Sequence, residues 1–189
     1  RRYKISNIKD VVKAFLDELE KYIDIPKGYR INIMEKENPK FLNDQKGSSY
    51  VKDGVHIVGE KLLIPNGILH KIRENVIQKE NIIDIFEKMD NETPVSQVID
   101  KCVIDKNPWF LYGSSKPDST PYKVTHTYKV KFNDEGLYNL RTVEAYSNDV
   151  LFENMSNLFA LDYATLKDGV DIDEINNTYH NNSNYQDIT

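Results

Sequence analysis

Cysteine is almost absent from this chain of 189 residues, which carries a single one, Cys102. One cysteine excludes an internal disulfide and a cysteine-based zinc site, and it fits a reducing compartment. No apolar run approaches the roughly 18 residues that a membrane-spanning helix needs, and no apolar segment of the secretory type follows the N-terminal Arg-Arg-Tyr-Lys. We therefore expect an intracellular protein that is not secreted and has no membrane partner.

Several familiar catalytic motifs are missing as well. The chain has no Gly-x-Ser-x-Gly, no His-Glu-x-x-His and no local cluster with the spacing of metal ligands. Its nearest approach to a phosphate loop, Gly113-Ser114-Ser115-Lys116, lacks the first glycine and the spacing of that motif. Any functional site must therefore be assembled from side chains that lie far apart in the sequence.

The net charge of −5 does not indicate nucleic-acid binding, but its distribution is uneven. Residues 161–189 contain six acidic residues and one basic residue, which account for the whole net charge. The rest of the chain is neutral overall, and a neutral domain with local basic patches can still bind a polyanion. We expect residues 1–161 to form one domain and residues 162–189 to be an acidic, Asn-rich tail or linker without fixed structure.

The pattern of apolar residues predicts an α+β fold, an antiparallel or mixed sheet with helices packed on one face. Period-two alternation predicts the strands, and recurrence at three and four residues predicts the helices. Residues 35–49 are polar and are expected to form a loop, and residues 95–104 are ambiguous. The expected helices are 6–24, 66–77, 82–89 and 147–161, and the expected strands are 29–34, 55–58, 109–112 and 122–132.

His56 is an ionisable residue inside the short β-branched run Val-His-Ile-Val. Because a strand alternates its faces, His56 and Val58 should point away from Val55 and Ile57. His56 is then either a core histidine with a satisfied hydrogen bond or a histidine that faces a ligand on the open side of a sheet.

Asp100 and Lys116 are the other candidates. Asp100 is either a metal ligand, since magnesium and manganese prefer carboxylate oxygens, or a turn residue paired with Lys101. Lys116 is either an exposed lysine or a phosphate-binding one, because Gly113 lets the backbone approach a ligand closely. His126 is expected to share a strand face with Tyr122 and Val124 and to be hydrogen-bonded or partly exposed.

Two stretches, KDGVHIV and VIDKCVIDKNPWFLYGSSKPDSTPYKVTHTY, resemble the N-terminal primase domain of the primase-helicases of large DNA viruses. These domains belong to the archaeo-eukaryotic primase (prim-pol) superfamily, and the resemblance covers about residues 1–132. It implies an RRM-like core and a nucleotidyltransferase that makes primers with Mg or Mn. The implied partners are a nucleoside triphosphate, a single-stranded DNA template and a helicase domain of the same polypeptide, in the host cytoplasm, in a viral replication factory, or in the virion.

The resemblance also assigns roles to individual residues. Gly54-Val55-His56 resembles the family's small-x-His motif, whose histidine contacts the phosphates of the incoming nucleotide, with Gly54 in place of the common serine. Ile99-Asp100 resembles the apolar-Asp motif that gives the last metal ligand. Lys116 is similar to a basic position near the nucleotide. His56 and Asp100 are thus the implied catalytic residues, and Asp100 is the implied metal ligand.

The family's first motif, a strand with two metal-binding aspartates, has no counterpart in this sequence. Residues 1–3 resemble the segment that follows that motif, so we expect the chain to begin just after the two aspartates. Two other interpretations stay open: a non-catalytic nucleic-acid-binding or protein-interaction domain that kept the fold, and an unrelated viral α+β domain. An Asp-x-Asp strand encoded directly upstream would support the primase interpretation over the non-catalytic one.

We predict that the 189-residue chain does not synthesise primers by itself. Without the paired aspartates the two-metal clamp that stabilises nucleotidyl transfer cannot form. A primer-synthesis assay on a single-stranded template with nucleoside triphosphates and manganese measures this directly. Robust primer formation by this chain would contradict the prediction.

Overall fold

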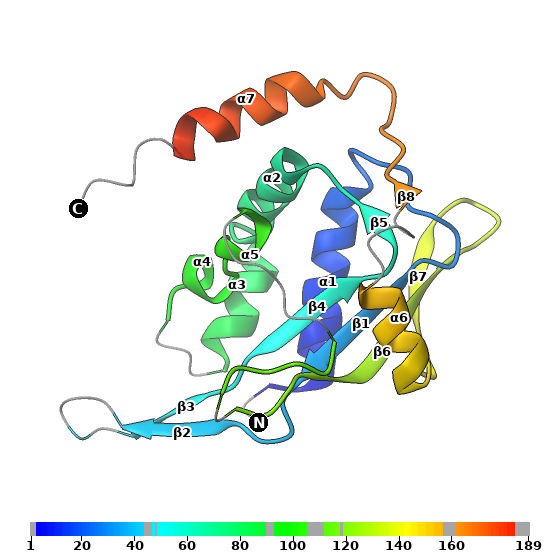
Figure 1. Ribbon diagram of the computed structural model, residues 1–189. Coiled ribbons are helices and arrows are strands. Elements are labelled where there is room, and N and C mark those ends of the chain that lie inside the picture. Colours follow the sequence, from blue (N-terminus) through cyan, green and yellow to red (C-terminus); the bar gives the residue numbers. More distant parts are fainter. Residues whose placement is uncertain are drawn as a thin grey trace. The chain divides into compact units, whose positions relative to one another are not determined.

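A computed structural model describes residues 3–43, 47, 49–89, 93–105, 112–117, 119–156 and 162–183 (Figure 1). Helices and antiparallel strands occur together in it, so the predicted α+β class is confirmed. The chain divides into two units, and each of them combines segments that are distant in the sequence. From the sequence, a division near residue 161 was expected instead. The first unit comprises Arg1, Pro26–Leu62 and Phe110–Asp162, and the second comprises Arg2–Ile25, Leu63–Trp109 and Tyr163–Thr189.

A four-stranded antiparallel sheet forms the centre of the first unit. Its strand order is β4-β1-β6-β7, with β1 at Arg30–Glu35, β4 at Val55–Gly59, β6 at Lys123–Phe132 and β7 at Tyr138–Val143. Five consecutive residues of β1 are buried, as expected for an inner strand that is covered on both faces. The predicted strands at 29–34, 55–58 and 122–132 are confirmed to within a residue or two.

A β-bulge in the pairing of β1 with β6 changes which side chains share a face. Ile33 is paired with His126, but the next residue, Met34, is paired with Val124, so one residue of β6 is left over. Directly paired residues lie on the same face, and Ile33 and Met34 point to opposite faces. His126 therefore lies on the opposite face from Val124, and the expectation that they share one is wrong.

Five strands are absent from the sequence prediction: β2, β3, β7 and the two-residue strands β5 (Leu62–Leu63) and β8 (Asp162–Tyr163), which pair with each other. In the segment expected to be a loop, β2 (Lys40–Asn43) pairs with β3 (Ser49–Lys52) as an antiparallel hairpin. Both strands are largely exposed, so neither carries the apolar alternation by which a half-buried strand is recognised. The edge strand β7 has one buried residue, Leu140, and is defined by its pairing with β6 rather than by its composition.

The face of the sheet toward which Met34 points carries a small apolar core. Met34 of β1 packs there with Tyr112 and with Leu151 of α6 (Asn148–Ser156), so the helix predicted at 147–161 is confirmed over these residues. Around them lie the partly buried Val58, Tyr122, Val124 and Met155. Tyr112 was expected in a strand but lies in a turn, and residues 109–111 lie outside the described ones.

Helices make up most of the second unit. They are α1 (Ile5–Leu19), α2 (Asn66–Val76), α3 (Glu80–Glu87), α4 (Val95–Val98), α5 (Cys102–Asp105) and α7 (Ile172–Ser183). Apolar residues at spacings of three and four bury one face of α1, and α1 packs against α2 and α3. None of the helices in the described part of the chain is long and apolar enough to cross a membrane.

The helix α7 lies where the sequence analysis places a tail without fixed structure. Its first turn is capped by Asp171, whose side chain accepts a hydrogen bond of 2.9 Å from the backbone N–H of Glu174. It packs against α2, and Tyr179 donates a hydrogen bond of 2.6 Å to the carboxylate of Glu74 while its ring stacks on His70. Tertiary contacts therefore stabilise an Asn-rich helix whose own propensity is low.

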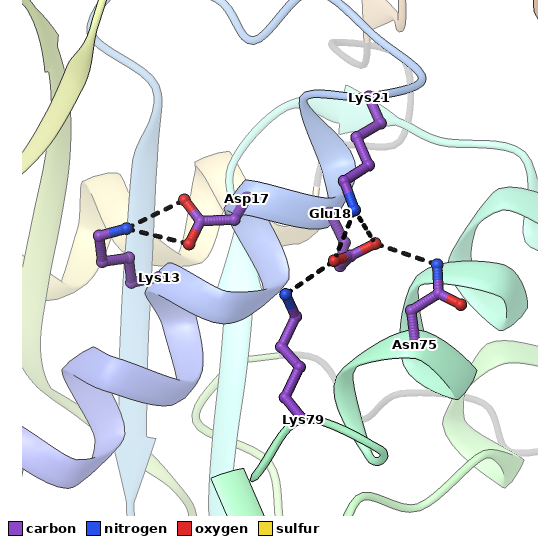
Figure 2. A network of polar contacts seen from close by, with 6 residues as sticks. All are labelled: Lys13, Asp17, Glu18, Lys21, Asn75 and Lys79. Atoms are coloured by element: carbon purple, nitrogen blue, oxygen red, sulfur yellow. Dashed lines mark hydrogen bonds and ion pairs between the residues drawn. The ribbon is translucent and has the colours of Figure 1, made fainter. Parts of the chain in front are cut away.

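A buried carboxylate, Glu18 of α1, ties together three segments of the second unit (Figure 2). Only 2% of Glu18 is exposed, and it accepts hydrogen bonds from Lys21 Nζ (2.8 Å) and Asn75 Nδ2 (3.0 Å) and pairs with Lys79 Nζ (2.8 Å). Burial alone would raise the pKa of Glu18, but the hydrogen bonds from Lys21, Lys79 and Asn75 hold that pKa at about 2. The ionised carboxylate is therefore the form that the fold requires.

We expect Glu18→Gln to lower the free energy of unfolding by about 2 kcal/mol, the range for hydrogen bonds to a charged group. The neighbouring Asp17→Asn is the matched control, because its pair with Lys13 is exposed and should contribute less than about 0.5 kcal/mol (Figure 2). Urea unfolding of both variants measures the difference. Equal losses in the two variants would show that Glu18 has no special role.

Acid should remove the same contribution. Because the pKa of Glu18 is lower in the folded chain than its ordinary 4.5, its stabilisation is complete above that value and is lost as the pH falls toward 2. Urea unfolding between pH 6 and pH 3 measures this slope, with both limits chosen to bracket about 4.5. A slope that is the same in the Glu18→Gln variant would contradict the assignment.

Candidate functional site

The imidazole of His56 lies on the same face of the sheet as Met34, stacked on a tyrosine. His56 is paired with Met34 of β1, whereas the next residue, Ile57, is paired with Ile33 on the opposite face. The alternation predicted from the sequence is therefore found in the structure. The ring of His56 lies 3.8 Å from that of Tyr122, centroid to centroid, with an interplanar angle of 18°. This stack fixes the plane in which the imidazole can meet a ligand.

Gly54 allows Tyr122 to come this close. A Cβ atom at Gly54 would lie 2.7 Å from the hydroxyl oxygen of Tyr122, closer than real Cβ contacts come. Because the tyrosine ring is rigid and already stacked on His56, it could not yield without disturbing the stack. The small residue two positions before His56 thus has a packing reason that is visible in this chain.

Lys36 completes the group. It follows the last residue of β1, and its Nζ lies 5.3 Å from the centroid of the Tyr122 ring, within the range of a cation–π contact. The same Nζ donates a hydrogen bond to the hydroxyl of Ser119. We name His56, Tyr122 and Lys36 the histidine–lysine site. An ammonium group and an imidazole that both contact one aromatic ring form a setting suited to an anion.

Sequence reasoning missed two of these three residues. Lys36 was assigned to a polar loop, although its position directly after a predicted strand places it beside the end of that strand. Tyr122 was assigned to the face of His126, because the bulge that separates them leaves no mark in a simple alternation.

The electrostatics of the site favour a neutral histidine. Burial lowers the pKa of His56, and the positive charge of Lys36 lowers it further. Burial also raises the pKa of Tyr122, with a contribution from the nearby Asp53, so its phenol stays protonated. A bound anion would reverse the balance at His56, since an adjacent negative charge favours the imidazolium.

Asp100 belongs to the second unit. It lies exposed between α4 and α5, and its Oδ1 accepts a hydrogen bond of 2.8 Å from the backbone N–H of Cys102. Arg73 holds the same segment by donating hydrogen bonds to the carbonyls of Ile99 (2.6 Å) and Ser96. This geometry is that of an Asx turn, so Asp100 is a turn residue, as one of the two sequence interpretations has it. Its pairing with Cys102 is local and does not test the metal role.

Magnesium or manganese, which the resemblance implies, needs several oxygen ligands at one place. Among the described residues, no three His, Cys, Asp or Glu side chains are grouped so that they could hold a metal ion. Asp100 is a candidate ligand, but among the described residues it belongs to no group of three potential metal ligands. The described residues thus do not fit a complete metal site.

Lys116 lies exposed in a loop of the first unit, three residues after Gly113. Gly113 has a φ of 85°, a backbone conformation that glycine adopts without strain, so the predicted turn before Lys116 is present. Part of the segment that carries the resemblance, residues 106–111, lies outside the described residues.

Comparison with known families gives one match over most of the chain. The model of the C962R protein N-terminal AEP domain matches residues 1–128, which include the whole histidine–lysine site. This stretch is two thirds of the chain.

A curated relative is similar over most of the chain. The "Putative helicase L207/L206" of Acanthamoeba polyphaga mimivirus is 28% identical over 179 residues, which are 90% of this chain. The chain spans only 18% of the length of that relative.

We expect Lys36→Gln to raise the pKa of His56, because it removes the positive charge that opposes protonation while the burial remains. The pKa should stay below its ordinary 6.5, since burial is the larger cause. An NMR titration of the imidazole carbon signals measures the change. Lys123→Gln, which removes an exposed lysine at the start of β6, is the control and should leave the titration unchanged.

Proposed function

Because the chain belongs to the family of the C962R protein N-terminal AEP domain, the archaeo-eukaryotic primases, we propose that it is the primase domain of a viral primase-helicase. The helicase in this proposal rests on the name of the mimivirus relative. The whole protein would make primers on single-stranded DNA, in the host cytoplasm or the virion, with the strands of the first unit as part of an RRM-like core.

The observation that carries the proposal is the histidine–lysine site. A nucleoside triphosphate brings several negative charges, and the site offers an ammonium group and an imidazole that can become charged, both at one aromatic ring. His56 lies in the edge strand β4, and Lys36 directly follows the neighbouring inner strand β1, so the sheet fixes the backbone beside both groups. Such preorganised groups stabilise phosphate charge without having to move.

In primer synthesis a hydroxyl oxygen of the growing strand forms a bond to the α-phosphorus of the incoming nucleotide, and the hydroxyl proton is released to water. The bond from that phosphorus to the oxygen of the β-phosphate breaks, and pyrophosphate leaves with the electron pair. We assign Lys36 and His56 to the β- and γ-phosphates, where they hold the leaving group in line. Tyr122 acts as a positioning residue, because its ring keeps the imidazole in one plane.

In this proposal the roles of Asp100 and Lys116 rest on the resemblance of their segments to the primase motifs. Asp100 would be a ligand for Mg or Mn together with carboxylates beyond the described residues, and Lys116 would be a further cation near the phosphates. Magnesium or manganese would supply charge neutralisation at the reacting phosphate when bound.

We expect His56→Ala and Lys36→Gln each to weaken the binding of a nucleoside triphosphate about tenfold, the loss of one charge-assisted hydrogen bond. Binding of the corresponding nucleoside should change much less, because it lacks the phosphates. Isothermal titration calorimetry of ATP and adenosine with the 189-residue chain measures both. A bound triphosphate should also raise the pKa of His56.

His126→Ala is the matched control, since this histidine pairs with Ile33 on the opposite face of the same sheet. It should leave triphosphate binding unchanged. Equal weakening by His126→Ala, or equal affinities for triphosphate and nucleoside in the unaltered chain, would contradict the proposed function.

A further inference from the structure

The hairpin formed by β2 and β3 extends beyond the ends of β1 and β4 in the first unit (Figure 1). Side chains alternate along both strands, and the cross-strand pairs show which of them share a face. Phe41 is paired with Val51 on one face. The opposite face, which we name the lysine–tyrosine face, carries two further pairs: Lys40 with Lys52, and Leu42 with Tyr50.

The lysine–tyrosine face has an unusual distribution of charge. Lys40 and Lys52 are both exposed and lie directly opposite each other, although like charges in this position destabilise a strand pair. An anion between them would remove that cost. Tyr50 lies two residues before Lys52 on the same face and is 48% exposed, so its ring is open to a ligand.

The root of the hairpin is the histidine–lysine site. The chain enters β2 from Lys36, and it leaves β3 through Asp53 and Gly54 into the strand that carries His56. A ligand that lies along the lysine–tyrosine face would therefore end near the bound nucleotide. Two residues of a strand span about 7 Å, so a base could stack on Tyr50 while the adjacent phosphate meets Lys52.

We propose that the lysine–tyrosine face binds single-stranded nucleic acid and guides it to the histidine–lysine site. The inference rests on the proposed function, because it takes the strand to be the template read beside the nucleotide. Alternating cations and aromatic rings are how proteins hold single strands without reading their sequence. An acidic peptide would gain from the lysines but not from the open ring, and an apolar partner would fit the Phe41 face better.

The test is fluorescence anisotropy of a labelled oligothymidylate of about 12 nucleotides, within the usual range of such sites, with the 189-residue chain. Tyr50→Ala and the double variant Lys40→Gln/Lys52→Gln should each weaken binding about tenfold. The double variant should also reduce the slope of log affinity against log salt by about 1.4, for two lost phosphate contacts. Tyr50→Phe, which keeps the ring, should bind like the unaltered chain.

Two controls match these changes. Phe41→Ala removes an aromatic ring that is 75% exposed on the other face of the same hairpin, and it should have no effect. Lys27→Gln/Lys61→Gln removes the same charge from exposed positions of the first unit that precede β1 and follow β4, whereas the hairpin joins the other ends of these two strands, and it should also have little effect. Circular dichroism checks that every variant keeps its fold.

Three results would overturn the inference: unchanged oligothymidylate binding by the hairpin variants, equal weakening by the Phe41 or Lys27/Lys61 controls, or equally tight hairpin-dependent binding of polyglutamate. Triphosphate binding, measured in parallel, separates this failure from that of the proposed function. If His56→Ala weakens triphosphate binding while the hairpin variants bind oligothymidylate normally, the hairpin assignment is wrong and the nucleotide site stands. The opposite pattern would leave the hairpin as a nucleic-acid site and reject the nucleotide site.

Discussion

The β-bulge between β1 and β6 is the constraint on which the candidate site depends. Pairing with β1 puts His56 beside Met34, and the bulge puts Val124, and with it Tyr122, on that same face. Without the leftover residue in β6, regular alternation would carry Tyr122 to the face of His126. Bulges are common where a strand must redirect a side chain, and here the redirected ring is the one on which His56 stacks.

The site also illustrates how a histidine can be held ready for an anion. In the absence of a ligand, burial and Lys36 both oppose protonation of His56, so the site avoids two adjacent positive charges. A polyphosphate would change this balance, since it neutralises Lys36 and attracts a proton to the imidazole. Binding would then be coupled to proton uptake, and the affinity for phosphate would rise as the pH falls toward the pKa of His56.

The helices and strands that were predicted best from the sequence are those that bury one apolar face. The strand of His56 and the long strand at 122–132 have clear apolar alternation, and the α1 helix has a clear apolar face, so all three were found. The hairpin of β2 and β3 lacks a buried face, and α7 depends on contacts such as that of Tyr179 with Glu74. Lys36 and Tyr122 meet only through strand register, which one sequence does not contain. Tertiary pairing, not local propensity, decided each of these cases.

Local charge, rather than net charge, determines whether this chain can bind a polyanion. The acidic residues that account for the net charge of −5 belong to residues 161–189, and those described after Asp162 lie in the second unit. The first unit holds Lys36, His56 and the opposed pair of Lys40 and Lys52. Repulsion between the positive charges of Lys40 and Lys52 destabilises the pairing of β2 with β3, and a phosphate that lies between them would remove this repulsion. By thermodynamic linkage, the repulsion that a bound phosphate relieves adds to the affinity of the hairpin for that phosphate.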